Sequence, residues 1–422
     1  MDSRYYLCID LKSFFASVEC VERGLDPMTS NLVVADPSRG RGAICLAVSP
    51  ALKSLGVRNR CRLFEIPKHI QYEIALPRMK RYMEYSARIY SIYLKYISAE
   101  DIHVYSIDEC FLDITQYCRL YGKTPKEMAL MLIDAVFAET GICATAGIGT
   151  NLFLAKVALD ITAKHTPDHM GYLDEAEFKR TIWYHQPITD IWNVGRGIAK
   201  RLERFGIYDL FGVAHFDEEK LYREFGVNAE FLIDHAHGVE PCTIADIHAY
   251  RSKSSSISNG QILFEDYGFD DAVIVLREMV EMLTLELVEK HLVTDSISLS
   301  VGYSKDVLKP AGGTMKLGEA TNSQKKLEKH FVAYFERVVK RGYPIRRINV
   351  GLNHLTDESY ATYDLFTDTE AEKREHDLQV TVLDIKKRFG KNAILKGRSL
   401  EKKATARIRN TLIGGHNGGE EQ

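Results

Sequence analysis

Two amphipathic helices set between strands of period two are the most restrictive pattern in this chain. The helices are expected over 272–291 and 323–341, where apolar residues recur every three or four positions. Segments that alternate apolar and polar residues accompany them, namely SISLSVGY, GGTMKLGEAT and RRINVGLNHL. The order β-α-β-β-α-β, at about 245–355, predicts a split βαβ module.

A second pattern, in which strands alternate with helices, covers the first 165 residues. Strands are expected over 4–10, over 142–150, and on both sides of a junction at Ser106–Glu109. A helix is expected between the second strand of this junction and the strand at 142–150. It begins with a capping box, with Thr124 as the N-cap and Glu127 at N3. The sequence therefore predicts an α/β region with acidic residues at the ends of its strands.

Residues 175–240 carry no strand pattern and are expected to be helical. With 422 residues, the chain has room for two to four domains. Its 45% hydrophobic and 27% charged residues are typical of a globular protein and disfavour disorder, collagen and coiled coil.

Several classes of protein are disfavoured by what the sequence lacks. No apolar run approaches the roughly 20 residues that cross a bilayer, and the N-terminus has no signal-peptide layout. The eight cysteines form no CxxC pair and no zinc spacing, which favours reduced core residues in the cytosol. The net charge of −3 gives no sign of a nucleic-acid partner, so that evidence must be local.

Positive charge is in excess in two segments. Residues 36–68 contain seven Lys/Arg against two Asp/Glu, and residues 373–409 contain twelve against four. The β-α-β-β-α-β segment is balanced, with fifteen against fourteen over 245–355. Net charge alone therefore does not assign DNA binding to that module.

Three carboxylates at strand ends are the strongest candidates for chemistry. Asp10 lies near the end of the first strand, and Asp108 and Glu109 lie at the junction within 102–115. Acids that converge on one sheet edge repel each other unless cations neutralise them, and two divalent cations there can support phosphoryl transfer. Strand-end acids are also common turn residues, so spacing alone leaves both interpretations open.

The motifs around these acids resemble those of Y-family DNA polymerases. They are IDLKSFFASVE, SIDECFLDIT and AGIGTNLFLAKVA, followed by the glycine turn at 193–197 and FGKNAILKGRSLEKKATARIRN. The similarity covers most of the chain and is greatest to the UmuC-like branch of Gram-positive bacteria and their mobile elements. It implies a multi-domain α/β (α+β) right-hand polymerase. The implied activity is low-fidelity translesion synthesis, by two-metal transfer of a dNMP to a primer 3′-hydroxyl.

The resemblance also implies a division of the chain into five parts. These are the palm (1–19 and 76–168), the fingers (20–75), an all-helical thumb with a helix-hairpin-helix (169–242), the little finger (243–356) and a C-terminal extension (357–422).

In the palm, the resemblance assigns Asp10, Asp108 and Glu109 as the catalytic, metal-binding carboxylates. The backbone carbonyl of Leu11 matches a further metal ligand. Two Mg²⁺ ions per active site are implied, and Mn²⁺ is expected to substitute for them.

The resemblance places Phe15, five residues after Asp10, at the steric gate that occupies the space of a ribose 2′-hydroxyl. The neighbouring Phe14 is expected in the core. Lys53 and Lys156 match cations that face the triphosphate.

The fingers differ from the family at one point. Many relatives carry a polar side chain near Pro50, which has no hydrogen-bond donor. Ser49 or a backbone amide is the expected substitute at the phosphates.

DNA contacts are expected in two places. Residues 193–197 resemble a helix-hairpin-helix, whose amide-lined turn binds a DNA phosphate through Gly195, Arg196 and Gly197, with an ordinary αα-turn as the alternative. Asn193 replaces the usual first glycine and tolerates a positive φ. In the little finger, the expected contacts are Arg251, Lys253, Arg346 and Arg347.

Two further segments invite interpretation. Residues 362–366, TYDLF, resemble a degenerate sliding-clamp peptide that inserts Leu365 and Phe366 into an apolar pocket; a linker that packs on its own protein is the alternative. The histidines His235 and His237 are expected on the thumb surface. The basic C-terminal tail leaves DNA, a recombinase filament or no partner open.

The expected partners are primer-template DNA and dNTPs, without a membrane, in the cytoplasm and in an SOS-type, mutator response to DNA damage. One rival is a polymerase-shaped binding protein, which the intact acids disfavour. The other is a different two-metal palm enzyme such as a nucleotide cyclase, which the DNA-binding elements disfavour.

Overall fold

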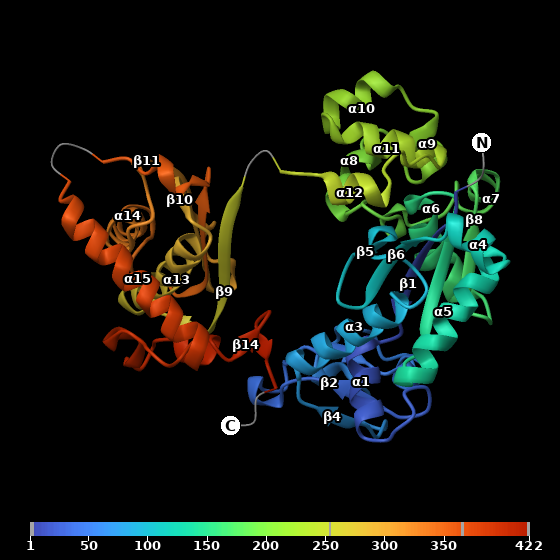
Figure 1. Cartoon of the computed structure of the whole chain (residues 1–422), viewed down its shortest axis with the longest axis horizontal. Coiled ribbons are helices and arrows are strands. Elements are labelled where there is room, and N and C mark those ends of the chain that lie inside the picture. Colours follow the sequence, from blue (N-terminus) through green and yellow to red (C-terminus); the bar gives the residue numbers. More distant parts are fainter. Residues whose placement is uncertain (1–3, 253–254, 364–366, 420–422) are drawn as a thin grey trace. The chain divides into compact units, whose positions relative to one another are not determined.

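The structure, a computed structural model of the whole chain, describes residues 4–252, 255–363 and 367–419. Its internal contacts divide it into two units (Figure 1). The first contains the chain up to Tyr250 together with the residues from Gly418, and the second is Arg251–Asn417.

A five-stranded sheet in the order β5-β6-β1-β7-β8 is the centre of the first unit. Its strands are β1 (Tyr6–Leu11), β5 (Ile102–Val104), β6 (Glu109–Asp113), β7 (Ala144–Gly149) and β8 (Met170–Leu173). The central strand β1 is antiparallel to both of its neighbours and is buried on both faces. That burial explains why its sequence is a nearly continuous apolar run.

Helices cover both faces of this sheet. On one face, α1 (Phe14–Glu22), α3 (Met79–Tyr93) and α5 (Pro125–Thr140) share an apolar core with β1. On the other face, α6 (Leu152–Val157) and α12 (Ile244–Ala249) pack against it, and α4 (Thr115–Tyr121) follows β6. The predicted capping box of α5 is confirmed, since Thr124 Oγ1 accepts from Glu127 N and Glu127 Oε2 accepts from Thr124 N.

A smaller sheet lies within the segment expected to form the fingers. It contains β2 (Leu32–Val34), β3 (Ala47–Val48) and β4 (Glu73–Ala75) in the order β3-β2-β4. The short helix α2 (Pro50–Ser54) follows β3 in the chain. Val33, Val48 and Leu52 belong to its separate apolar core.

The helices predicted for 175–240 are confirmed, and they share an apolar core with Phe153 and Val157 of α6 and Leu173 of β8. They are α7 (Glu175–Thr181), α8 (Arg196–Glu203), α9 (Leu210–Ala214), α10 (Glu218–Phe225) and α11 (Asn228–His237). The next helix, α12, lies in the first unit because Ile244 is buried in a cluster with Tyr6 and Phe111 of the central sheet. The unit boundary therefore falls at Tyr250/Arg251, eight residues beyond the expected start of the little finger at 243.

The second unit confirms the β-α-β-β-α-β order. The elements are β9 (Ser256–Tyr267), α13 (Phe269–Glu289), β10 (Leu292–Tyr303), β11 (Ala311–Thr321), α14 (Gln324–Val338) and β12 (Ile345–Asn353). The four strands form one antiparallel sheet in the order β11-β10-β12-β9, and the two helices share its apolar core (Figure 1).

The basic C-terminal segment packs on this second unit. It includes α15 (Thr369–Phe389) and α16 (Ala406–Arg409), while the short strands β13 (Thr356–Asp357), β14 (Leu412–Ile413) and β15 (His416–Asn417) flank them. Arg398 pairs with Glu328 of α14 at 2.6 Å, and Lys387 pairs with Glu289 of α13 at 2.9 Å. The region expected as a separate extension, 357–422, is thus part of the second unit up to Asn417. Its cations pair with acids of α13 and α14, and a count of charges along the sequence cannot reveal such pairs.

Among the described residues, none of the helices combines the length and the apolar character that a bilayer crossing requires.

Candidate functional site

The three predicted acids come together at one edge of the central sheet. Asp10 of β1 lies directly opposite Glu109 of β6 in the antiparallel register. Asp108 immediately precedes β6, and its carbonyl accepts a hydrogen bond of 3.0 Å from Leu11 N. Two strands about a hundred residues apart therefore bring these carboxylates to one place.

The charges at this edge are poorly balanced. Burial raises the pKa of Asp10 to about 7, and the negative charges of Asp108 and Glu109 add to that shift. Ser106 Oγ donates to Asp108 Oδ1 at 2.7 Å. Because the charges of Asp108 and Glu109 disfavour the ionised form of Asp10, the donor set fits divalent cations, which prefer carboxylate oxygens and would relieve the repulsion.

Glu109 is already engaged by the protein. Its Oε1 lies 2.7 Å from Lys156 Nζ and accepts from Cys8 Sγ at 2.9 Å. In the part of the chain that the structure describes, no three His, Cys, Asp or Glu side chains form a ready-made metal cluster. The contacts of Glu109 with Lys156 and Cys8 use only Oε1, so its second oxygen, Oε2, is the one that would serve a metal ion.

Lys156 is buried between acids. It also lies 3.1 Å from Asp160, and its ammonium is 5.8 Å from the centre of the Tyr105 ring. Burial disfavours its charged form, but the neighbouring Cys8 and Glu109 raise the pKa of Lys156 above its usual value.

Glycines allow Lys156 to approach the sheet. A Cβ added to Gly147 would lie 2.0 Å from Ala155 O, and one added to Gly149 would lie 2.2 Å from Ala155 N. The backbone of α6 therefore packs directly on β7, which explains the small residues of the AGIG run. This close packing positions Lys156 next to Glu109.

The expected triphosphate residues of the fingers differ in their surroundings. Lys53 is exposed, and desolvation lowers the pKa of its ammonium, while the charges of Asp10 and Asp108 oppose that shift. Lys53 therefore lies within electrostatic reach of the acidic edge. Ser49 is fully buried and its Oγ accepts from Leu52 N and Leu32 N, which gives it the role of a helix cap.

Phe14 and Phe15 have different environments. Phe14 is buried in the palm core, as predicted. Phe15 is half-buried, and its ring stacks on that of Tyr82, with centroids 4.5 Å apart and planes at 17°. One face of the Phe15 ring thus rests on a buried aromatic support.

The glycine turn before α8 has the expected backbone. Asn193 adopts φ of 67°, which confirms that this position needs a residue tolerant of positive φ. Gly195 is the N-cap residue of α8, and Arg196 and Gly197 begin the helix; all three are exposed. A Cβ on either glycine would meet nothing within 4 Å, so internal packing does not require glycine there.

The expected little-finger cations are spread out. Arg347 is exposed and lies across Gly302, whereas Arg346 pairs with Asp266 at 3.7 Å. Arg251 is exposed at the start of the unit. Lys253 lies outside the described residues.

Small residues, among them several with polar side chains but no cations, line the sheet of the second unit at a hollow of about 410 Å³. Strand register places these residues in adjacent rows across the sheet. They include Ser258, Ser298, Ser300, Gly312, Thr314 and Asn349.

The predicted clamp-binding residues Leu365 and Phe366 lie outside the described residues. The preceding Thr362 donates its backbone N–H to Ala320 O at 3.0 Å, and its Oγ1 accepts from Ala320 N at 2.7 Å. The segment therefore packs on its own protein as far as Thr362.

Several residues of the site were missed by the sequence interpretation. Lys164 is exposed, and its charge helps to lower the pKa of Lys53, so a second cation lies near the acidic edge. Outside the site, the prediction that His235 lies on the thumb surface is wrong: His235 is buried, and its ring stacks on that of Phe153 with centroids 4.0 Å apart. The support of Phe15 by Tyr82 could have been suspected only from the aromatic pattern of 80–98.

Comparison with known proteins gives two matches to family models. Residues 9–160 match the impB/mucB/samB family, and residues 254–365 match the C-terminal domain of the same family.

Curated relatives match over almost the entire chain. A protein of Halalkalibacterium halodurans named DNA polymerase IV 2 is 33% identical over 97% of this chain and 98% of its own. The UvrX protein of Bacillus subtilis, named provisionally for the repair of ultraviolet damage, is 32% identical over 97% of both chains.

A solved Y-family DNA polymerase chimera has the same fold. It superimposes with a TM-score of 0.64 at 23% identity, and the match covers 84% of this chain and 99% of the chimera.

Proposed function

The chain belongs to the impB/mucB/samB family and is a DNA-directed DNA polymerase of the Y family, and on this premise we propose that Asp10, Asp108 and Glu109 form its catalytic centre. The reaction is translesion synthesis directed by a DNA template. The 3′-oxygen of the primer attacks the α-phosphate of a dNTP, the bond to the β-phosphate breaks, and pyrophosphate leaves. The convergence of three acids on one sheet edge is the observation that carries this assignment.

Polymerases of this family use divalent metal ions, and we propose two Mg²⁺ ions, with Mn²⁺ as a substitute. Asp10, Asp108, Glu109 and the carbonyl of Leu11 would hold them. The chemistry that such ions supply when bound is activation of the attacking oxygen and neutralisation of charge on the phosphates. The raised pKa of Asp10 supports the need for cations at this edge.

Lysines on two sides of the acidic edge would bind the triphosphate. Lys53 and Lys164 are exposed, and Lys156 lies beside Glu109. An ammonium stabilises negative charge on the phosphates and on the departing pyrophosphate. Ser49 has no part in this proposal, because its hydroxyl caps α2 within the core.

Phe15 would select the sugar of the nucleotide. A ring held against the C2′ position leaves no room for a ribose hydroxyl. The half-buried position of Phe15, on the helix that follows β1 and Asp10, supports this role.

We propose that the protein holds DNA at two places without reading its sequence. The turn at Gly195–Gly197 offers backbone amides at a helix N-terminus, and its open glycines leave room for a phosphate. In the second unit, serines, threonine and backbone groups of the polar sheet hollow, with Arg347 nearby, would follow the backbone. Arg251, Lys253 and Arg346 would add charge.

Two further partners are proposed from the family resemblance. Leu365 and Phe366 would bind a sliding clamp, and a recombinase filament would act with the polymerase in an SOS-type response that raises mutation. The location that fits a chromosomal DNA substrate is the cytoplasm.

Primer extension with Mg²⁺ and four dNTPs, on undamaged and abasic templates, tests the proposal. We expect extension by the wild type, passage of the abasic position, and no product from Asp108→Ala. Tight binding of primer-template without extension would instead favour a polymerase-shaped binding protein, and product from Asp108→Ala would refute the assigned centre.

A further inference from the structure

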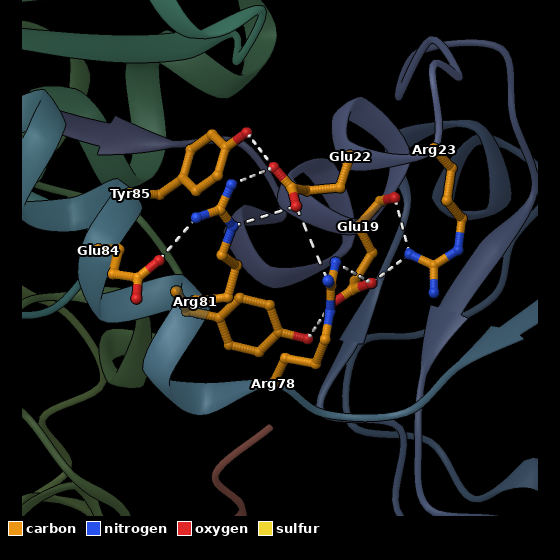
Figure 2. Close-up of polar contacts among 8 residues, drawn as sticks. Glu19, Glu22, Arg23, Arg78, Arg81, Glu84 and Tyr85 are labelled. Atoms are coloured by element: carbon orange, nitrogen blue, oxygen red, sulfur yellow. Dashed lines mark hydrogen bonds and ion pairs between the residues drawn. The ribbon is translucent and has the colours of Figure 1, made fainter. Parts of the chain in front are cut away.

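Two adjoining ion-pair ladders connect α1 with α3 (Figure 2). Only one of them contains a residue, Tyr82, whose ring stacks on Phe15. In the first ladder, Glu19 accepts from Arg78 and from Tyr82. In the second, Glu22 accepts from Arg81 and from Tyr85. The second ladder repeats the first with an offset of three residues: Glu22, Arg81 and Tyr85 take the places of Glu19, Arg78 and Tyr82.

The first ladder is buried and tightly connected. Glu19 and Tyr82 are fully inaccessible to solvent. Arg78 donates to the Glu19 carboxylate from both Nε and Nη2 at 2.9 Å, and Arg23 donates to it as well. Burial alone would raise the pKa of Glu19, but these hydrogen bonds lower it, so the carboxylate is a charged acceptor in the folded protein.

Tyr82 connects the Glu19 carboxylate to the ring of Phe15. The Tyr82 hydroxyl donates to Glu19 Oε1 at 2.8 Å, and the opposite part of the side chain is the ring on which Phe15 stacks. Phe15 and Glu19 are four residues apart on α1 and so share one face of that helix. Carboxylate, phenol and phenyl ring thus form one connected unit.

The second ladder is joined to the first, since Arg78 Nη1 lies 3.7 Å from Glu22 Oε2, but its Tyr85 offers a natural control for Tyr82. The Tyr85 hydroxyl donates to Glu22 Oε1 at 2.7 Å, and Arg81 Nη2 lies 2.8 Å from the same carboxylate. Among the ring pairs of the described residues, Phe15 stacks with Tyr82 and adjoins Phe14, but it has no such pair with Tyr85.

We propose that Tyr82, fixed by Glu19 and Arg78, is a positioning residue that sets how strictly this polymerase rejects ribonucleotides. The inference rests on the proposed role of Phe15 as the sugar gate. A ring can exclude a 2′-hydroxyl only if its side chain keeps its position when the hydroxyl comes into steric contact with it. Tyr82 prevents the Phe15 ring from turning away, because it occupies the space behind it.

The test compares kcat/KM for dCTP and for CTP opposite a template dG. We expect Tyr82→Leu, which removes the supporting ring, to lower the preference for dCTP about tenfold, the order of an aromatic pair. Tyr82→Phe keeps the ring but loses its anchor to Glu19 and should lower the preference less. Tyr85→Leu and Tyr85→Phe, the matched controls, should leave the preference as in the wild type.

A double-mutant cycle separates this inference from the role of Phe15. Phe15→Ala should abolish most of the preference, and Tyr82→Leu should then cause no further loss. If Phe15→Ala leaves the preference unchanged, the gate assignment is wrong and the inference falls with it. If Phe15→Ala abolishes the preference but Tyr82→Leu and Tyr82→Phe do not alter it, or alter it as much as the Tyr85 variants do, the gate stands and the positioning role is refuted. Because the readout is a ratio for one enzyme preparation, a general loss of folded protein does not imitate the effect.

Discussion

Replacement of Gly147 by alanine should displace the helix that carries Lys156. The new Cβ would lie 2.0 Å from Ala155 O and 2.3 Å from Leu159 N, and both are backbone atoms that cannot rotate away. To restore an ordinary contact, α6 must retreat from β7 by about 1.4 Å. A shift of that size would carry the 2.7 Å contact between Lys156 and Glu109 beyond hydrogen-bonding reach.

The expected cost follows from that displacement. Overpacking of a core by one methyl group destabilises a protein by about 2 kcal/mol, which lowers the Tm of a unit of this size by about 4–8 °C. A misplacement of about 1 Å at a catalytic site can reduce the rate about 100-fold. We therefore expect Gly147→Ala to show both a lower Tm and a much lower kcat/KM for dNTP incorporation.

Thermal unfolding and single-nucleotide incorporation kinetics measure these two effects. Gly318→Ala is the control, because a Cβ at that position meets nothing within 4 Å. If Gly147→Ala keeps the wild-type Tm and kcat/KM, then close packing of α6 on β7 does not position Lys156, and the reasoning is refuted.

Three further predictions concern charge. The pKa of Glu19 is lower in the folded state than its usual value, so its interactions stabilise the protein above about pH 4.3 and are lost as the pH falls through the folded pKa. The Tm of the wild type should therefore decrease more steeply between pH 5 and pH 3 than the Tm of Glu19→Gln. Equal slopes for the two proteins would contradict this. Lys156→Met leaves the buried Glu109 without its cation, so melting curves should show a lower Tm. It also removes a proposed contact with the triphosphate, so initial rates should give a higher KM for dNTP. An unchanged KM would argue against that contact. Arg196→Ala should weaken DNA binding and reduce the slope of log Kd against log salt by about 1, as measured by fluorescence anisotropy, whereas the exposed Arg180→Ala should change neither.

Local patterns predicted much of the fold. The alternation and helical spacing of 245–355 gave the β-α-β-β-α-β order, the Thr124/Glu127 pair gave a helix start, and Asn193 was expected at a positive φ. These features depend on residues that are near each other in the sequence. The position of acids at strand ends likewise anticipated that Asp10 and Glu109 would meet, since antiparallel neighbours share an edge.

Features that depend on distant partners could not be predicted. The pairing of Glu109 with Lys156 requires α6 to lie against β7, and the burial of Ser49 depends on the backbone of Leu32. The excess of positive charge in 373–409 left DNA, a recombinase filament or no partner open for this segment, yet cations such as Arg398 meet acids of α13 and α14. A count of charges cannot reveal such neutralisation, because it contains no information about which residues fold together.

The acidic edge of the palm sheet is proposed to catalyse nucleotide transfer. Single-turnover extension of a primer by one nucleotide in Mg²⁺, with wild type and Asp10→Asn, tests it most directly when DNA affinity is measured on the same preparations. Loss of an interaction made only in the transition state lowers the rate without weakening substrate binding. We expect a rate at least about 1000-fold lower for Asp10→Asn at unchanged Kd for primer-template. Extension by Asp10→Asn at a rate near that of the wild type would contradict catalysis by this edge.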